Sequence, residues 1–149
     1  MIKQIRSLSQ NKNLDIKALS SVEETIWGLR SYIGEITLGN SRETFEMTIE
    51  WWNLEDYQKQ WHIGLERIKT HSTSCLVARI EGYQGNPVQI DWWLLYKESN
   101  KIIIRNQLLI STILTSTING PFTPETCYNY IPPKSRSKKV SEWVVDLEN

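Results

Sequence analysis

Residues 44–71 read TFEMTIEWWNLEDYQKQWHIGLERIKTH and contain the two most regular patterns in the sequence. In the first part of this stretch, Phe45, Met47, Ile49 and Trp51 alternate with threonine and glutamate. Successive side chains of a strand point to opposite faces, so this period of two predicts a strand with one apolar and one acidic face.

The second part predicts a helix over residues 54–71. Tyr57, Trp61, Leu65 and Ile68 follow one another at steps of four, four and three, which places them on one stripe of a helix. Asn53, just before the helix, is a favourable N-cap. Acids in the first turn and bases in the last turn suit the helix dipole; they are Glu55 and Asp56, and Arg67, Lys69 and His71. Because the apolar stripe needs a partner, we expect the helix to lie across the apolar face of a sheet.

Further segments predict strands that are joined by short turns. The segment that ends at Leu38 and the turn residues 39–41 predict a hairpin with the alternating strand. After the helix, three closely spaced strands predict an antiparallel meander, and the central one, apolar on both sides, suits burial on both faces. The three strands are predicted over residues 74–83, 89–96 and 102–109. Residues 111–135 contain several prolines, so long regular structure is not expected there, and a last short strand is predicted over 140–147. The predicted class is α+β, with an antiparallel β-sheet of about five or six strands and one main helix, about 54–71, packed on it.

Length and charge limit the possible classes of protein. The chain has 149 residues, which predicts one domain over 1–149, with residues 1–20 as a loosely ordered arm or a first edge element. The formal net charge is zero, whereas a dedicated nucleic-acid or membrane-surface protein normally carries a basic excess. The zero is a cancellation, because residues 1–66 carry 7 basic and 10 acidic side chains and residues 67–149 carry 10 and 7.

The sequence predicts a cytoplasmic protein. The start of the chain lacks the apolar core of a signal peptide, and the most apolar stretch, 102–118, is broken by polar residues. Cys75 and Cys127 are the two cysteines, and we expect free thiols, with a disulfide as the alternative.

Catalytic and metal-binding patterns are missing from the sequence. There is no CxxC, no HExxH and no Cys/His cluster, so neither a metal nor a cofactor is expected. His71 and Cys75 are close in sequence and are the one pairing that could serve a small enzyme, but no third orienting group is identifiable. A buried strand cysteine is the preferred interpretation, and we expect a protein that is not an enzyme.

Seven tryptophans suggest a second alternative, a binding module for sugars or single-stranded nucleic acid. The pairs Trp51-Trp52 and Trp92-Trp93 each place one ring on either side of a strand. Single-strand binding would also require a basic track. Over residues 35–66, however, acids outnumber bases seven to two, so core packing is the preferred interpretation of the rings.

Several spaced motifs resemble a known family. They are Phe45-x-x-x-Ile49-x-Trp51-Trp52, Asp56-Tyr57-x-x-Gln60-Trp61-x-x-x-Leu65-x-Arg67, Cys75-Leu76-Val77, Trp92-x-Leu94-Leu95-Tyr96, Ile104-x-Asn106 and Ser141-Glu142-Trp143-x-Val145. Together they resemble the immunity proteins of bacterial contact-dependent growth inhibition systems. The resemblance implies a small cytoplasmic protein that binds and neutralises the toxic C-terminal domain of a matching toxin, often a nuclease. The partner implied is that toxin domain, with no nucleic acid, membrane or small-molecule substrate.

The matched positions look structural and do not locate the surface that binds the toxin. An inhibitor of a nuclease gains association rate and specificity from an acidic surface that meets a basic active site. The sequence therefore predicts contact residues on the acidic strand face and at the helix start, namely Glu46, Glu50, Glu55 and Asp56.

Overall fold

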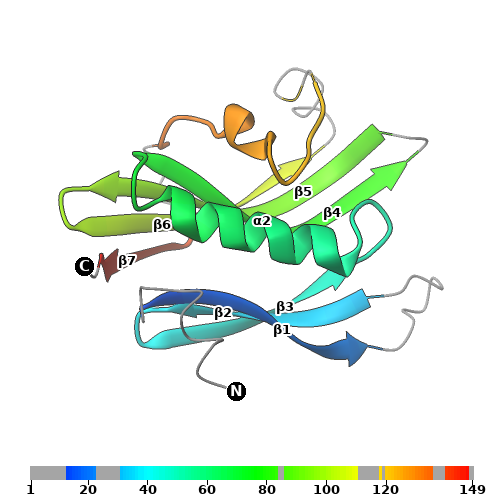
Figure 1. Cartoon of the computed structure of the whole chain (residues 1–149), viewed down its shortest axis with the longest axis horizontal. Coiled ribbons are helices and arrows are strands. Elements are labelled where there is room, and N and C mark those ends of the chain that lie inside the picture. The colour runs from blue at the N-terminus through cyan, green and yellow to red at the C-terminus, as the bar shows by residue number, and fades with distance from the viewer. Residues whose placement is uncertain are drawn as a thin grey trace.

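The structure, a computed structural model, describes residues 13–22, 31–83, 86–110, 118, 120–135 and 140–147. It contains two antiparallel sheets and one main helix, α2 (Leu54–Arg67), which runs between them (Figure 1). The predicted α+β class with antiparallel strands and a main helix is confirmed. The strands divide into a three-stranded and a four-stranded sheet, where the sequence predicted one sheet of five or six strands.

The three-stranded sheet has the order β1 (Leu14–Val22), β2 (Ser31–Leu38), β3 (Ser41–Thr48). The predicted hairpin is β2–β3, and its turn contains Gly39 at φ +68°, a conformation that glycine adopts without steric cost. Strand β1 pairs with β2 and is the edge strand of this sheet. The predicted arm over residues 1–20 therefore contains the first part of a strand, and its residues 1–12 lie outside the described residues.

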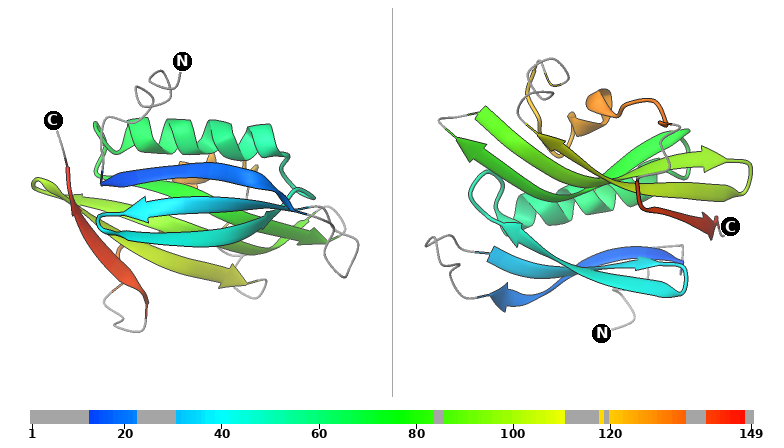
Figure 2. Two further views of the ribbon diagram at one scale, coloured as in Figure 1. Left: turned by 90° about the horizontal axis from the view of Figure 1, so that it is seen from below. Right: turned by 180° about the vertical axis from the view of Figure 1, so that it is seen from behind.

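The four-stranded sheet has the order β4 (Thr73–Tyr83), β5 (Asn86–Glu98), β6 (Lys101–Ile110), β7 (Glu142–Asp146). The predicted meander is confirmed as β4–β5–β6, and β5 is buried on both faces, with Trp92 at 0% and Trp93 at 3% exposure. Between β6 and β7, residues 120–135 contain one short 3-10 helix, η1 (Cys127–Tyr130), and cover one face of this sheet (Figure 2).

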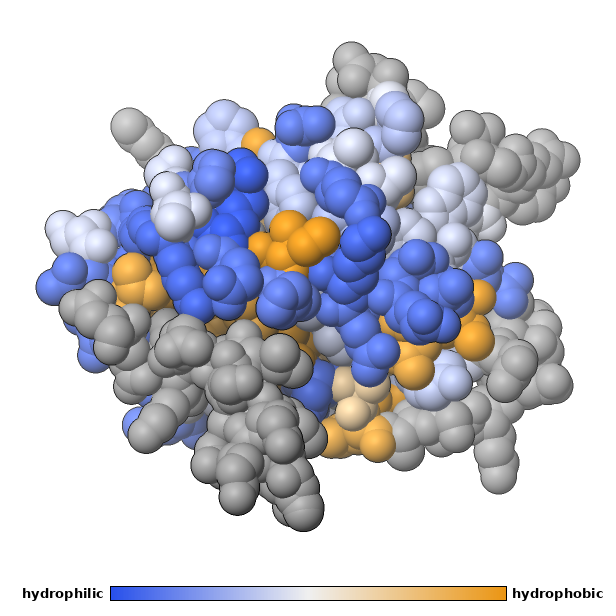
Figure 3. All heavy atoms as spheres, viewed as in Figure 1, coloured by the Kyte–Doolittle hydropathy of each residue, from blue (hydrophilic) through white to orange (hydrophobic). Residues whose placement is uncertain are grey.

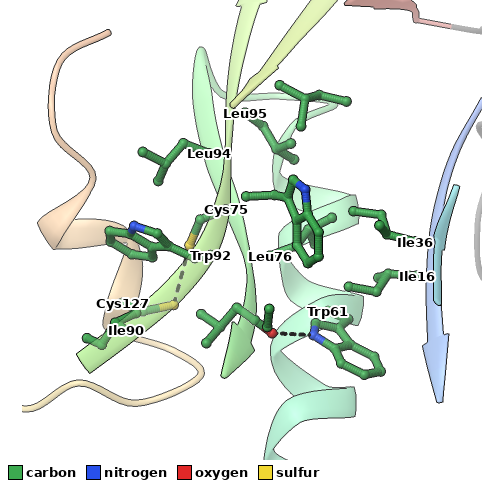
Figure 4. Packing of buried hydrophobic residues seen from close by; sticks show 14 of the residues in the cluster. Ile16, Ile36, Trp61, Cys75, Leu76, Ile90, Trp92, Leu94, Leu95 and Cys127 are labelled. Atoms are coloured by element: carbon green, nitrogen blue, oxygen red, sulfur yellow. Dashed lines mark hydrogen bonds between the residues drawn. The ribbon is translucent and has the colours of Figure 1, made fainter. Parts of the chain in front are cut away.

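Two separate layers of side chains therefore pack on the four-stranded sheet. On one side lie α2 and the three-stranded sheet. The ring centroid of Phe45 in β3 lies 5.1 Å from that of Trp93 and 6.0 Å from that of Trp61. On the other side lies the 120–131 segment, from which Cys127 meets Cys75 (Figure 4). The Phe122 ring centroid of this segment lies 5.7 Å from that of Trp92. The two rings of the Trp92-Trp93 pair are thus covered from opposite sides.

The start of α2 is fixed by the predicted cap. The side chain of Asn53 accepts a hydrogen bond from the Asp56 N–H at 2.8 Å, and the Asp56 carboxylate accepts one from the Asn53 N–H at 3.1 Å. This reciprocal pair is a capping box, which satisfies two backbone donors that a helix start leaves unpaired. The helix ends at Arg67, earlier than the predicted His71, and the next residues form turns with Lys69, Thr70 and His71 N–H groups donating to the last helical carbonyls.

Helix α2 lies along the open edge of β4, and its Trp61 ring also packs against Phe45 on the apolar face of β3. Tyr57, Gln60 and Trp61 hydrogen-bond the backbone of this edge. The Tyr57 hydroxyl accepts from Ile80 N–H at 3.1 Å, and Trp61 Nε1 donates to the Val77 carbonyl at 2.8 Å. These groups occupy the positions at which another strand would bond.

Gln60 makes the most extensive contact with this edge. Its Oε1 accepts from Val77 N–H at 2.7 Å, and its Nε2 donates to the Cys75 carbonyl at 2.8 Å. The residue is 0% exposed. A buried backbone group without a partner costs about 1–3 kcal/mol, so Gln60 alone removes a penalty of several kcal/mol.

The end of β3 is joined to β4 by the same helix. The Tyr57 hydroxyl donates to the Thr48 carbonyl at 3.0 Å, and the Thr48 hydroxyl donates to the Ile80 carbonyl at 3.3 Å. This linkage explains why β3 stops at Thr48, although the alternating pattern continues to Trp51. It also explains the two sheets, because α2 occupies the β4 edge at which a further strand could have paired.

Gly64 allows the helix to approach β4 closely. A Cβ atom at this position would collide with the Cys75 carbonyl oxygen and lie 3.0 Å from the Leu76 side chain. The Gly64 carbonyl in turn accepts a hydrogen bond from the Ser74 hydroxyl at 2.7 Å.

Gly64→Ala is therefore expected to destabilise the protein by about 1–3 kcal/mol, the range for inserting a methyl group into a packed interface. In a helix without this contact, the same change would stabilise by about 1 kcal/mol. Urea unfolding followed by circular dichroism measures the difference, with the exposed His62→Ala on the same helix as the control, expected within about 0.5 kcal/mol of wild type. A Gly64→Ala protein that is more stable than wild type would contradict the close approach.

Candidate protein-binding surface

The four predicted contact acids lie between the end of β3 and the first turn of α2. Glu50 is exposed in the bend at residues 49–52, and Glu55 is exposed in the first helical turn. Each of these two carboxylates has no hydrogen bond or ion pair within the described residues. Both are thus available to a partner.

The other two acids have partners within the chain. Asp56 closes the capping box with Asn53. Glu46 is half-buried on β3, accepts a hydrogen bond from the Ser31 hydroxyl at 3.3 Å and lies 4.0 Å from Arg79 of β4. These two carboxylates therefore stabilise the region from which Glu50 and Glu55 project.

The surface around α2 is mainly polar. Figure 3 shows this face, on which hydrophilic residues cover most of the described surface and apolar residues form separate small spots. Large contiguous apolar patches are typical of obligate interfaces. A partner that docks on this face would meet charged and polar groups first, and such groups control association rate and specificity.

Most of the tryptophan rings belong to the packed interior. Trp52, Trp61, Trp92 and Trp93 are each at most 4% exposed. The ring centroid of Trp52 lies 5.3 Å from that of Tyr57 and 5.8 Å from that of Phe122. Rings in these positions stabilise the core and are not accessible for stacking a sugar or a base, which removes the main support for the sugar or single-strand alternative.

His71 and Cys75 are in opposite environments. The Cys75 sulfur is 0% exposed and lies 3.7 Å from the sulfur of Cys127. His71 is exposed, and its Nδ1 lies 2.9 Å from the Thr70 hydroxyl. Burial raises the pKa of the Cys75 thiol well above its ordinary value, and the neighbouring Cys127 adds to the rise. A protonated, enclosed thiol is a poor nucleophile, so this pairing offers no active site.

Within the described ranges, no group of three or more His, Cys, Asp or Glu side chains is arranged to hold a metal ion. No helix in the described part of the chain combines the length and the apolar character needed to cross a membrane.

Two structural features were not predicted from the sequence. One is the side-chain pairing of Gln60 and Tyr57 with the β4 edge, and the other is the contact between Cys75 and Cys127. A signal for the first was present, because Gln60 follows Tyr57 by three residues and so occupies the stripe of the helix that faces the core. No local pattern could signal the second, since the two cysteines are 52 residues apart.

Comparison with known proteins gives this arrangement of strands and helix a family. A family model described as the CdiI N-terminal domain matches residues 47–149, which include α2 and the whole four-stranded sheet. This chain belongs to the CdiI N-terminal domain family. The resemblance to immunity proteins of contact-dependent growth inhibition systems is thereby confirmed.

A solved structure shares the fold of this CdiI-family chain. It is described as a CdiA-CT/CdiI toxin and immunity complex from Enterobacter cloacae. The TM-score is 0.71 at 22% sequence identity, over 90% of this chain and 90% of that one. Comparison with curated protein sequences gives no match. The fold is therefore shared nearly end to end, while about four in five aligned residues differ, as 22% identity implies.

Proposed function

We propose that this immunity protein binds the toxic C-terminal domain of one cognate CdiA-type toxin and neutralises it by stoichiometric inhibition in the cytoplasm. The observation that carries the proposal is membership of the CdiI family, together with a fold found in a chain of a solved toxin and immunity complex. The partner is a protein domain alone, without nucleic acid, membrane or small-molecule substrate, and the protein acts without catalysis, metal or cofactor.

The proposed toxin is a nuclease, because the exposed carboxylates on this surface have no hydrogen bond or ion pair within the described residues and remain available to basic groups of a partner. Nuclease active sites bind a polyanion and are therefore basic, and an acidic inhibitor surface complements them. Glu50 and Glu55, which are exposed, supply this charge, with Glu46 and Asp56 beside them. Attraction between opposite charges accelerates encounter and disfavours partners of the wrong sign.

The proposed contact residues are Glu46, Glu50, Glu55 and Asp56, in two roles. Glu50 and Glu55 are exposed and meet basic side chains of the toxin directly. Asp56 and Glu46 add negative potential while their carboxylates also hold the helix start and the β3 end in place. A rigid helix terminus is a precise platform for such contacts, since its backbone does not need to be ordered on binding.

The test of the function is growth rescue. The cognate CdiA-type toxin domain would be induced in bacterial cells with and without co-expression of this protein. We expect growth to recover only with the immunity protein, and recovery to fail with a CdiI-family protein from a non-matching system. Death of the cells while both proteins are soluble and present in equal amounts would overturn the proposal.

Charge reversal tests the proposed surface. The double change Glu50→Lys and Glu55→Lys is expected to lower the association rate with the toxin domain by roughly tenfold or more at low salt. The loss should shrink as ionic strength rises, because salt screens exposed charges over about 10 Å at 0.1 M. Stopped-flow mixing at several salt concentrations measures both effects. Asp56 is kept in the variant, so that the capping box stays intact.

A matched control reverses one acid at the other end of the same helix. Glu66 is exposed and lies in the last turn of α2, near Lys69. At 0.1 M salt, Glu66→Lys should leave the association rate within about twofold of wild type, since Glu66 lies about 16 Å along the helix from Glu55 and the Debye length is about 10 Å. Equal losses in both variants, or no loss in either, would contradict the choice of Glu50 and Glu55 as contacts.

A further inference from the structure

Two thiols from distant parts of the chain meet in the interior. Cys75 lies on β4 and Cys127 begins η1, and their sulfur atoms are 3.7 Å apart (Figure 4). Both are free thiols and both are 0% exposed. No other pair of cysteines exists in the sequence, so neither has an alternative partner within the chain.

The two sulfur atoms are in van der Waals contact but are not bonded. A disulfide requires about 2.05 Å between sulfur atoms, so one or both must move by a total of about 1.7 Å. Cys75 is held in a strand of the four-stranded sheet, whereas Cys127 belongs to a four-residue 3-10 turn within an irregular segment. The turn can therefore adjust more easily than the strand.

The 120–131 segment is also the part that can expose the thiols. Most of its hydrogen bonds are local, such as Cys127 N–H to the Thr123 carbonyl at 3.0 Å and the Thr126 hydroxyl to the Pro121 carbonyl at 2.6 Å. A few contacts tie it to the rest of the molecule. They are the Tyr128 hydroxyl with Gln60, the Tyr128 ring with the Arg67 guanidinium, the Phe122 ring with Trp52 and Trp92, and an ion pair of Glu125 with Lys59. Segments with few long-range contacts open without global unfolding.

We propose that Cys75 and Cys127 are a redox-active pair that forms an intrachain disulfide by exchange with a low-molecular-weight disulfide such as oxidised glutathione. The bond fastens the 120–131 segment covalently to β4, at the level where Gln60 already joins α2 to the same strand. This inference is independent of toxin binding, because it rests on the contact between the two sulfurs and on the segment that covers them.

The reaction balances as two thiol–disulfide exchanges. When the segment opens, the Cys127 thiolate attacks one sulfur of oxidised glutathione and releases one glutathione thiolate. The Cys75 thiolate then attacks the Cys127 sulfur of the mixed disulfide and releases the second glutathione. The protein gives up two protons and two electrons, and one oxidised glutathione becomes two reduced molecules. In the closed state neither step proceeds, because both thiols are buried and oxidised glutathione cannot reach them.

The test oxidises the whole protein and identifies the product. Wild type would be incubated with oxidised glutathione in buffer and in a sub-denaturing concentration of urea, then analysed by intact mass and peptide mapping. We expect a mass about 2 Da below that of the reduced protein, one cross-linked peptide pair containing Cys75 and Cys127, and reversal by dithiothreitol. The oxidised protein should unfold at a Tm at least about 5 °C higher, because the bond closes a long loop in the unfolded chain.

Single-cysteine variants are the matched controls. Cys127→Ser and Cys75→Ser should give no cross-linked peptide and no rise in Tm on oxidation, and either variant suffices if the other does not fold. A parallel sample treated with iodoacetamide reports whether the thiols become accessible. Two separate glutathione adducts, two alkylated thiols without a disulfide, or two thiols that react with neither reagent would each overturn the proposal.

Discussion

The open edge of β4 is the constraint on which the rest of the structure depends. An exposed strand edge presents unpaired backbone donors and acceptors, and here this edge lies within the molecule, with Cys75, Val77 and Ile80 all at 0% exposure. Tyr57, Gln60 and Trp61 satisfy it from one helix, at the positions where a neighbouring strand would bond. The helix thereby replaces a fifth strand of the four-stranded sheet.

This substitution also places the acids that we propose as contacts. Tyr57 joins β4 to the end of β3, and Gln60 joins it to Tyr128 of the segment on the opposite side. The start of α2 is then fixed between these anchors and its capping box, so Glu50 and Glu55 project from a rigid corner of the molecule. Stable positions of this kind reduce the entropy that a binding partner must overcome.

The local parts of this fold were predictable from the sequence, and the parts that depend on long-range contacts were not. Period-two and helical patterns predicted β3, α2, the β4–β6 meander and the Asn53 cap, because these depend on neighbours within a few residues. The division into two sheets depends on how Tyr57 and Gln60 meet a strand that follows them in the chain. The candidate acids were chosen by their charge and by the strand and helix patterns. Their separation into two exposed and two partly engaged carboxylates depends on Ser31, Asn53 and Arg79.

Native-state amide hydrogen exchange tests most directly whether α2 replaces a strand at this edge. The N–H groups of Val77 and Ile80 should exchange as slowly as those of Leu94 in the central strand β5, because Gln60 and Tyr57 accept from them. In Tyr57→Phe, exchange at Ile80 should accelerate by roughly tenfold or more, while Val77 and Leu94 keep their protection. Val77 and Ile80 amides that exchange in wild type as fast as unprotected peptide groups would contradict the account.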